Sequence, residues 1–330
     1  MLVYVKQDPL TSFQAIIAID NTARGPALGG CRFQEYASLE EAITDAKRLA
    51  GGMTLKSALA NLPLGGGKMV ILKPSQTYDR TAFFQQAGAF IHTLKGQYIT
   101  ALDSGTDIPD MDAIATQTPF VTCTHQHPHP NPAPFTALGL LEAMKASCYC
   151  LFGSSSMIGK TIAIQGLGAV GMRLAHLCYQ EGARLRVCDH HPDRVKLALE
   201  AYQATAIRGD FWSEPCDILA PCALGGGIHD GTIPHIQAPL IISGANNPLQ
   251  EEHIHSQGLF QRGITYPPDY VVNAGGIIQV AAQYFRSPLK KVHLHIKQIY
   301  QTTERLLSEA KEARCSPVEV ACLTAHIPHV

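Results

Sequence analysis

Short apolar runs and helical spacing alternate along the first part of the chain. Residues 13–19 form an apolar run bounded by polar residues, so we expect a buried strand there. Ser38 opens a stretch with capping-box spacing, and apolar residues recur at helical intervals over 42–50. A helix should therefore begin at Ser38. The glycine pair 51–52 argues against one unbroken helix as far as Ala60.

Three more elements are expected before a proline-rich stretch. They are a strand at 68–72, a helix at 80–94 and a strand at 98–102. From His125 to Pro134 the prolines are too frequent for either regular element, which predicts a stiff linker and a domain boundary. The alternating His125, His127 and His129 lack the spacing and neighbours of a closed metal site, so a solvated hinge loop is favoured and no metal is expected.

Beyond the linker, helical and strand patterns alternate, which predicts right-handed crossovers and a mainly parallel sheet. We expect helices at 137–146, 169–181 and 192–202, and strands at 161–165, 184–188, 217–220 and 240–242. The amphipathic stretch 291–313 is expected to be a helix. The fold class is therefore α/β with two domains, an N-terminal α/β domain over 1–132 and a doubly wound domain over 133–285. We expect residues 286–330 to return to the first domain, and a cleft to separate the two.

Composition narrows the class of protein. The 330 residues suffice for two domains, and 46% hydrophobic with 16% charged residues is typical of a soluble globular protein. Because 26 basic residues balance 27 acidic ones, neither nucleic acid nor an anionic membrane is an expected partner. The N-terminus lacks a secretory signal and no apolar run reaches the roughly 18 residues of a membrane span, so we expect a cytoplasmic protein. The ten cysteines include no C-x-x-C pair, which favours reduced, packed thiols.

A glycine-rich motif follows the expected strand 161–165 and opens a helical pattern. Gly166, Gly168 and Gly171 have the G-x-G-x-x-G spacing in the strand–turn–helix setting that makes this motif specific. The first glycine permits a tight turn, the second lets the backbone approach a pyrophosphate, and the third packs helix on strand. The helix N-terminus at Val170 supplies free amides for the anion. The motif predicts a dinucleotide site, and turns without a ligand are the alternative.

The acid at the end of the second strand of this domain bears on the choice of cofactor. Asp189 follows the glycines by about 20 residues, where a carboxylate accepts hydrogen bonds from the adenosine ribose and repels a 2′-phosphate. This predicts NAD as the cofactor rather than NADP. His190, His191 and Arg194 lie close enough in sequence to accommodate a phosphate, which keeps NADP as the alternative.

Two lysines and an acid in the first domain are candidates for chemistry. Lys56 lies among small and apolar residues, Lys68 follows three glycines, and Asp103 follows an apolar strand. A phosphate-loop interpretation fails, because Met69 stands where Ser or Thr is required. Two ammonium groups facing one carboxylate in a partly dry cleft would lower the pKa of one lysine and make it a usable base. The alternative is two ordinary surface lysines.

Eight stretches between residues 12 and 285 resemble the amino-acid dehydrogenase family of leucine, valine, phenylalanine and glutamate dehydrogenases, most of all its leucine-specific members. They are Gly25–Arg32, Gly52–Ser57, Leu64–Lys68, Asp103–Thr106, Asp110–Asp112, Ala220–Gly225, Gly244–Asn247 and Pro268–Gly276. The resemblance implies reversible NAD-dependent oxidative deamination of an L-amino acid to a 2-oxo acid and ammonium. It also implies a homo-oligomer.

The resemblance carries over residue roles. In the family, the lysine that matches Lys56 holds the substrate carboxylate, the one that matches Lys68 is the catalytic base, and the acid that matches Asp103 relays protons. The residue that matches Asn246 contacts the cofactor or the substrate, and the one that matches Ala223 lies against the cofactor. This chain has Ser104 after the acid, where family members often have Val or Met.

Substrate choice is expected from the residues that match the family's side-chain pocket. They are Leu28, Gly29, Met53, Ala101, Ile277 and Val280, and plain core packing is the alternative for each. None of them can pair with a charged side chain, and similar glutamate dehydrogenases carry lysine and serine in place of Leu28 and Val280. A branched aliphatic substrate is therefore expected. An aromatic amino acid, phenylalanine or tryptophan, is the runner-up, and a non-catalytic NAD-binding subunit is the alternative from another class.

Overall fold

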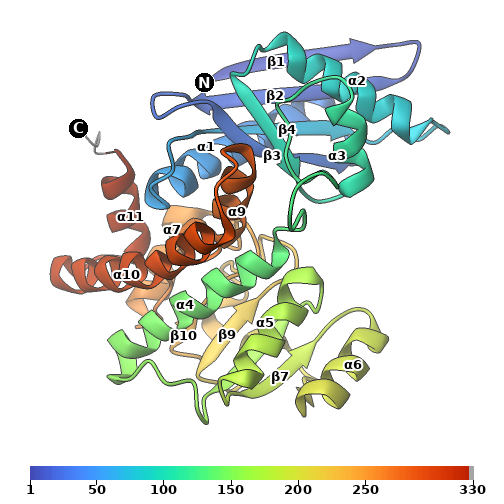
Figure 1. The fold of residues 1–330 in the computed structure, drawn as a ribbon. Coiled ribbons are helices and arrows are strands. Elements are labelled where there is room, and N and C mark those ends of the chain that lie inside the picture. Colours follow the sequence, from blue (N-terminus) through green and yellow to red (C-terminus); the bar gives the residue numbers. More distant parts are fainter. Residues whose placement is uncertain (327–330) are drawn as a thin grey trace. The chain divides into compact units, whose positions relative to one another are not determined.

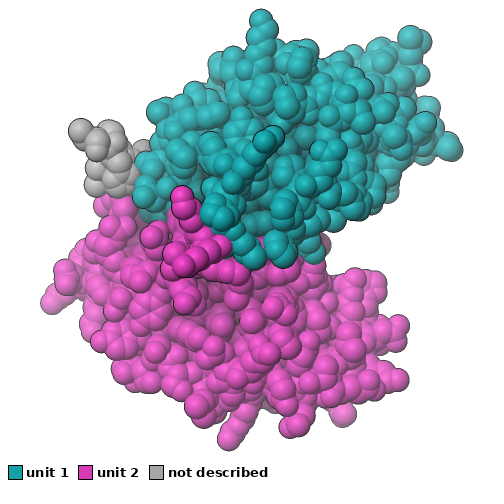
Figure 2. Space-filling model, in the orientation of Figure 1, with its two compact units in different colours: residues 1–132, 277–289 teal, residues 133–276, 290–330 magenta. Residues whose placement is uncertain are grey.

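The computed structural model describes residues 1–326 of the chain, and these form two compact units (Figure 2). Unit 1 comprises Met1–Pro132 and Ile277–Leu289. Unit 2 comprises Ala133–Gly276 and the chain from Lys290. Each unit is built on one five-stranded sheet with helices packed against it, which confirms the expected α/β class.

Unit 1 contains a mixed sheet. Its strands are β1 (Leu2–Asp8), β2 (Phe13–Asn21), β3 (Ala27–Gln34), β4 (Gly65–Leu72) and β5 (Tyr98–Leu102). In space their order is β1-β2-β4-β3-β5, with β2 antiparallel to β1 and β4, and β3 parallel to β4 and β5. The predicted strands at 13–19, 68–72 and 98–102 are confirmed as β2, β4 and β5. The sequence patterns did not predict β1 or β3.

Helices cover both faces of this sheet (Figure 1). Helix α1 (Leu39–Leu59) buries alanines against Ile16, Ala18 and Val70 on one face. Helices α2 (Arg80–Thr93) and α3 (Ile108–Ala115) lie on the other face, where Phe83 and Phe84 of α2 pack edge to face with aromatic rings of β2 and β3. Side chains of a strand alternate between faces, so β3 sends Phe33 toward α2 and its neighbours toward α1.

Helix α1 is continuous through the glycine pair, although that pair argued against one unbroken helix. It begins where Ser38 accepts a hydrogen bond from the backbone amide of Glu41 (3.1 Å), as the capping box predicted. It then runs through Gly51 and Gly52 to Leu59. Each glycine costs a helix about 1 kcal/mol. Burial of one alanine-rich face against the sheet outweighs that cost, because tertiary packing supplies most of the stability of helices in proteins.

Unit 2 contains an all-parallel sheet, as expected. Its strands, β6 (Thr161–Gln165), β7 (Arg184–Cys188), β8 (Thr205–Ala206), β9 (Ile218–Pro221) and β10 (Leu240–Ile241), lie in the order β10-β9-β6-β7-β8. Its helices are α4 (Ala133–Phe152), α5 (Ala169–Gln180), α6 (Pro192–Tyr202), α7 (Glu252–Gln261), α8 (Asp269–Val272), α10 (Leu289–Ala313) and α11 (Pro317–His326), with 3-10 turns at Phe211–Ser213 and Ile233–His235. From β6 the chain first adds β7 and β8 on one side of β6, and later adds β9 and β10 on the other side. This reversal of strand order creates a topological switch point at β6.

The C-terminal part of the chain is divided differently from the prediction. Helix α9 (Gly275–Tyr284) lies mostly in unit 1, where Gln283 accepts a hydrogen bond from the amide of Cys123 (2.8 Å) and donates one to the carbonyl of His129 (3.0 Å). Helix α10 belongs to unit 2, because Ile299 packs against Gly139 of α4. The expected return of 286–330 to the first unit is therefore wrong for the stretch from Lys290.

Helix α4 is the one described helix that is long and apolar enough, by length and composition, to cross a membrane. The sequence analysis expected no such stretch. Within unit 2 this helix packs against α5 and α8, and 56% of its most apolar window is buried. A helix that is apolar on most sides is typical of a domain core, and that is where α4 lies.

The fit of α1 against β4 gives a test of the packing. A methyl group added at Gly66 would meet the backbone nitrogen of Thr54 at 2.2 Å, whereas one added at Gly51 meets nothing within 4 Å. We expect Gly66→Ala to lower the free energy of unfolding by about 1–3 kcal/mol through overpacking. The control Gly51→Ala should raise it by up to about 1 kcal/mol. Denaturant unfolding measures both, and an equal effect of the two substitutions would contradict this account.

Candidate active site

The polar cluster of unit 1 lies on the face of the sheet that α1 covers. In the register of the sheet Cys31 pairs with Met69 and Gly30 pairs with Ala101. Paired residues on neighbouring strands point to the same face, and successive residues alternate. Lys68 is next to Met69 and Arg32 is next to Cys31, so both point to the face opposite that pair. Asp103 lies two residues after Ala101 and so points to the same face as Lys68 and Arg32. Three elements far apart in sequence thus bring three charged groups together.

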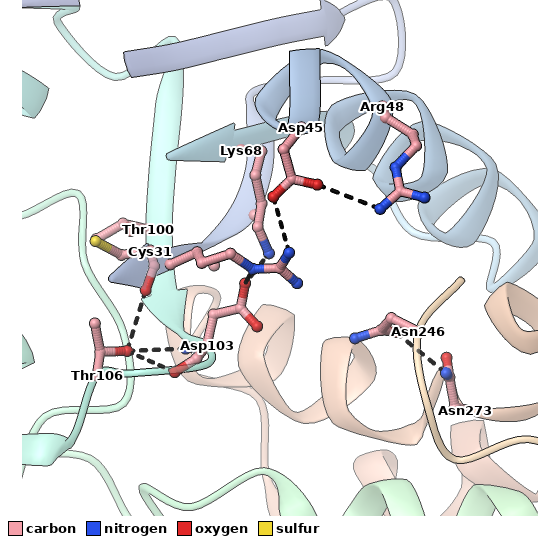
Figure 3. A network of polar contacts seen from close by, with 12 residues as sticks. Cys31, Asp45, Arg48, Lys68, Thr100, Asp103, Thr106, Asn246 and Asn273 are labelled. Carbon is pink, nitrogen blue, oxygen red and sulfur yellow. Dashed lines mark hydrogen bonds and ion pairs between the residues drawn. The ribbon is translucent and has the colours of Figure 1, made fainter. Parts of the chain in front are cut away.

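Lys68 and Asp103 form a buried ion pair (Figure 3). The Lys68 ammonium donates to Oδ2 of Asp103, and the two side chains are only 5% and 11% exposed. The second cation at this carboxylate is Arg32, whose Nε lies 3.6 Å from the same oxygen. Burial opposes the charged form of Asp103, but Lys68 and Arg32 outweigh it and hold the pKa of this carboxyl below its ordinary value.

The loop after β5 holds Asp103 in place. The Thr106 hydroxyl accepts a hydrogen bond from the Asp103 amide (3.0 Å) and lies 3.1 Å from the carbonyl of Cys31. Gly105 has φ +83°, a conformation that favours glycine. A Cβ on Gly30 would lie 2.7 Å from the Cβ of Asp103. The Asp-Ser-Gly-Thr motif and the glycine at position 30 therefore serve one purpose, the placement of this carboxylate.

Lys56 lies in the last turn of α1 and is 9% exposed. The neighbouring Ser57 hydroxyl donates to the carbonyl of Gly65 (3.2 Å), which fixes this turn against the start of β4. Gly65 and Gly66 lie within β4, and a Cβ on either would collide with backbone of another element at 1.8 to 2.2 Å. The glycines before Lys68 therefore make room for close packing and form no phosphate loop, in keeping with the sequence interpretation.

The six predicted pocket residues all lie in unit 1. Leu28 and Ala101 share the sheet face of Lys68 and are buried. Met53 precedes Lys56 by one turn of α1 and is partly exposed. Ile277 and Val280 lie one turn apart on α9 and are buried. Gly29 points to the other face, and its carbonyl accepts the Tyr98 hydroxyl (2.7 Å). Their part in substrate choice stays a prediction.

The glycine-rich turn of unit 2 follows β6 and leads into α5. Gly166 has φ +88°, and a Cβ on Gly171 would lie 1.9 Å from the Gly166 carbonyl oxygen. Gly168 is the N-cap residue of α5 without a side-chain cap, and a Cβ there would meet nothing within 4 Å. The N-terminus of α5, whose first turn contains Val170, therefore has no side-chain cap and lies beside open space at Gly168. This is the geometry that a pyrophosphate requires, so the turn fits a dinucleotide.

Asp189 follows β7 at the same edge of the sheet. Its Oδ2 accepts from the amide of Leu167 (2.6 Å) and its Oδ1 from the amide of His191 (2.8 Å), and Arg194 lies 3.7 Å away. Partial burial disfavours the anion, but these amides and Arg194 hold the pKa of Asp189 below its ordinary value. The carboxylate thus stays charged beside the glycine-rich turn.

Two further predicted cofactor residues follow the strands on the other side of β6. Ala223 comes after β9, with its backbone nitrogen 2.9 Å from a Cβ placed on Gly166, and Asn246 comes after β10. The amide of Asn273 donates to the side-chain oxygen of Asn246 (3.2 Å) (Figure 3). All the predicted cofactor residues therefore lie at the carboxyl ends of the strands of unit 2, around the switch point where α/β sheets bind ligands.

The histidines of the linker have protein partners. His125 Nδ1 contacts the carboxylate of Asp112, and His127 Nδ1 lies 2.7 Å from the Thr124 hydroxyl. The carbonyl of His129 accepts from side chains of α9. Within residues 1–326 no group of three or more His, Cys, Asp or Glu side chains is placed to hold a metal ion.

Comparison with known proteins identifies the family. The sequence profile described as Glu/Leu/Phe/Val dehydrogenase, dimerisation domain, matches residues 2–120. The profile described as glutamate/leucine/phenylalanine/valine dehydrogenase matches residues 187–326. The chain belongs to the Glu/Leu/Phe/Val dehydrogenase family. The resemblance drawn from the sequence motifs is confirmed, and the chain is an amino-acid dehydrogenase of this NAD(P)-dependent family.

Family members named for different substrates are similar to this chain. It is 44% identical to leucine dehydrogenase of Geobacillus stearothermophilus, over 92% of this chain and 84% of that protein. It is 38% identical to phenylalanine dehydrogenase of Lysinibacillus sphaericus, over 95% and 84% of the two chains. The crystal structure of L-tryptophan dehydrogenase from Nostoc punctiforme matches with a TM-score of 0.83 at 36% identity, covering 98% of this chain and 94% of that one.

Two residues of the dehydrogenase site received no role from the sequence. Arg32 lies within the family-like stretch Gly25–Arg32, and its place beside Asp103 follows only from strand pairing between β3 and β5. Asn273 lies within Pro268–Gly276 and orients Asn246. Both residues lie in stretches that resemble the family, and this was the one sign in the sequence that they could matter. A place in such a stretch does not tell which carboxylate or amide a side chain contacts.

Gly168 offers a test of the dinucleotide turn of this dehydrogenase. The methyl group of Gly168→Ala would project into open space at the N-terminus of α5, so the fold should be unchanged. Because the methyl would occupy space needed by the pyrophosphate, we expect nicotinamide dinucleotide to bind at least about tenfold more weakly. Gly209→Ala, also in open space but in a different loop, is the matched control. Fluorescence titration with NADH measures binding, and unchanged affinity would contradict the assignment.

Proposed function

We propose that this dehydrogenase catalyses the NAD-dependent, reversible oxidative deamination of a branched aliphatic L-amino acid. The products are the 2-oxo acid, ammonium and NADH. The observation that carries this proposal is the buried Lys68–Asp103 pair on the sheet face that also presents Leu28 and Ala101. A paired ammonium and carboxylate beside an apolar surface can move protons for a substrate whose own side chain is uncharged.

The residues of unit 1 would divide the chemistry among them. Lys56 binds the substrate carboxylate and so fixes the direction of the Cα–H bond, which is a contribution of positioning. NAD, when bound, supplies the hydride acceptor. Asp103 first accepts a proton from the substrate ammonium group, so that the amine is neutral when hydride leaves. Lys68 in its neutral form takes a proton from the water that attacks the resulting substrate imine, and Asp103 returns its proton to the nitrogen so that it leaves as ammonia. Their withdrawal from solvent keeps these transfers within the site.

The predicted pocket residues support an aliphatic substrate. Leu28, Ala101, Ile277 and Val280 are buried and carry no group that could pair with a charge. Burying the side-chain carboxylate of glutamate against them would cost several kcal/mol. The leucine dehydrogenases among the relatives are in keeping with this choice.

An aromatic substrate is the second candidate, and one observation favours it. This chain covers 94% of the L-tryptophan dehydrogenase structure from Nostoc punctiforme, and 84% of the leucine dehydrogenase of Geobacillus stearothermophilus. Apolar pockets separate substrates that differ by one methylene by only about 1–3 kcal/mol, so the lining residues do not decide between the two.

The preference for NAD over NADP rests on Asp189. Its carboxylate is held as an anion beside the turn, where it would accept the adenosine ribose hydroxyls and repel a 2′-phosphate. We also propose a homo-oligomer, supported by the description of the profile that matches residues 2–120 as a dimerisation domain. A cytoplasmic location stays a prediction.

Removing the proposed base tests the function. We expect Lys68→Ala to lower turnover at least about 100-fold while NADH still binds, since loss of a general base has this scale. Lys73→Ala is the matched control, because Lys73 lies just beyond the same strand and is exposed. Initial rates of NADH formation with leucine, valine, isoleucine, phenylalanine, tryptophan and glutamate provide the measurement.

The same substrate panel separates the candidate functions. The fastest turnover with a branched aliphatic amino acid supports the proposal, and the fastest with phenylalanine or tryptophan supports the second candidate. A preference for glutamate contradicts both. NADH binding without turnover of any amino acid would identify a non-catalytic subunit.

Removing the proposed ribose ligand tests the choice of cofactor. Asp189→Ala should weaken NAD binding more than NADP binding, because a hydrogen-bond acceptor and a repulsive charge are both lost. The ratio of the two dissociation constants is the measurement, since it cancels any general loosening of the turn. Asp193→Ala, in the first turn of α6, should leave the ratio unchanged. An unchanged ratio in Asp189→Ala would show that this carboxylate does not select the cofactor.

A further inference from the structure

Arg32 has one donor that the folded unit leaves unused. Its Nε is buried and, among residues 1–326, has no acceptor at hydrogen-bond distance. The nearest carboxylate oxygen is Oδ2 of Asp103 at 3.6 Å, the same atom that Lys68 contacts. A buried donor without a partner is costly and calls for an explanation. A relative shift of less than about 1 Å would bring Nε to normal hydrogen-bond distance from that oxygen.

The other side of the Arg32 guanidinium is held firmly. Nη1 donates to Oδ2 of Asp45 on α1 at 2.9 Å. The Tyr36 hydroxyl donates to the same oxygen at 2.8 Å, and Arg48 pairs with the other oxygen of Asp45 at 3.3 Å. The Tyr36 hydroxyl therefore holds Asp45, and Asp45 holds Arg32. The contact from Arg48 is an exposed ion pair and adds little to this placement. The planar fork of arginine then keeps Nε directed toward Asp103 without any further adjustment.

The proposed reaction requires Lys68 to change partners. While it contacts Asp103, the Lys68 ammonium donates to that carboxylate, and to act as a base it must release a proton to solvent and turn to the reacting water. Asp103 would then be a buried carboxylate without its hydrogen-bonded cation, which is strongly unfavourable. Arg32 is the other cation close enough to replace Lys68.

We propose that Arg32 is a positioning residue whose Nε–H receives the Asp103 carboxylate each time Lys68 leaves it. This inference rests on the proposed function. Arg32 does not transfer a proton, because a guanidinium stays charged in proteins. Its role is to keep Asp103 anionic and in place, so that the carboxylate accepts its proton from the substrate nitrogen and from no other source.

The surroundings of Asp103 set the direction of the pH effect. Lys68 of β4 and Arg32 of β3 favour the anion, and burial opposes it. The thiol of Cys31 and the hydroxyl of Tyr98 lie on the opposite face of the sheet, and both stay neutral because burial raises their pKa values. The charges farther out, next to Arg32 and Cys31, are those of Asp45 and Arg48 on α1 and Asp110 on α3. Removal of Arg32 deletes one of two stabilising cations, so the pKa of Asp103 must rise.

The test compares Arg32→Gln, Arg32→Lys and the control Arg48→Gln. Arg48 touches the same Asp45 but is exposed and does not reach Asp103. We measure kcat and KM against pH with NAD and the amino acid that the wild-type enzyme oxidises fastest. Arg32→Gln should lower kcat about tenfold, leave KM within a few-fold, and move the acid limb of the kcat profile up by about one pH unit. Arg48→Gln should match the wild type.

The lysine variant separates charge from geometry. Arg32→Lys keeps a cation near Asp103 and should restore the acid limb, but one ammonium cannot serve Asp45 and Asp103 together, so kcat should stay severalfold below wild type. This variant also keeps the proposal testable if Arg32→Gln fails to fold. A wild-type kcat in Arg32→Lys, or an unmoved acid limb in folded Arg32→Gln, overturns the proposal. A large rise in KM alone would place Arg32 on the substrate carboxylate and overturns it as well.

A second readout distinguishes failure of this inference from failure of the proposed function. The Asp103 carboxyl is titrated by ¹³C NMR in protein labelled at aspartate and free of substrate, with the signal assigned by Asp103→Asn. If wild-type enzyme oxidises no amino acid, the proposed function is wrong and with it the catalytic role of Arg32. If the enzyme is active and the carboxyl titrates alike in wild type and Arg32→Gln, the inference about Arg32 alone is wrong.

Discussion

The withdrawal of two opposite charges from water constrains the first unit of this dehydrogenase more than any other interaction. A buried ammonium or carboxylate is stable only with a well-placed counter-charge and with its remaining hydrogen-bonding capacity satisfied. Lys68 and Asp103 meet that condition because β3 pairs with β4, which carries Lys68, and with β5, which ends just before Asp103. Close backbone packing at Gly30 and the Thr106 hydroxyl complete the placement. The same requirement gives Arg32 its importance.

Much of the fold was predictable because the decisive patterns are local. The strands at 161–165, 184–188 and 98–102 are short apolar runs between polar residues, and the structure has them at those bounds. The glycine-rich turn was predictable for the same reason, since its three glycines act within one strand–turn–helix unit. Local patterns were also sufficient to bring Lys68 and Asp103 under consideration together, once the motifs were compared with a known family.

What the sequence could not supply depends on contacts between distant residues. Strand β3 was missed because Gly29 and Gly30 interrupt its apolar run, and they are small because β4 and the loop after β5 approach them. The glycine pair argued against an unbroken α1, but propensity at Gly51 and Gly52 is weaker than packing of the whole helix. The helical spacing of apolar residues in α10 shows that one face of the helix is buried. It does not show that this face packs against α4 at Gly139. Arg32 belongs to the same group, since no spacing relates it to Asp103.

The hydrogen bond from the backbone amide of Cys123 to the side chain of Gln283 has a consequence for how such a protein is made. It joins two parts of unit 1 that are separated by most of unit 2 in the chain. During synthesis the first 132 residues leave the ribosome with this buried amide still lacking its acceptor, which arrives only after the dinucleotide-binding sheet is complete. Folding from the N-terminus can therefore begin in the first unit but cannot finish there. A gene fragment that ends at the linker would encode an unfinished domain, so neither half of this enzyme can be exchanged between relatives by a single cut.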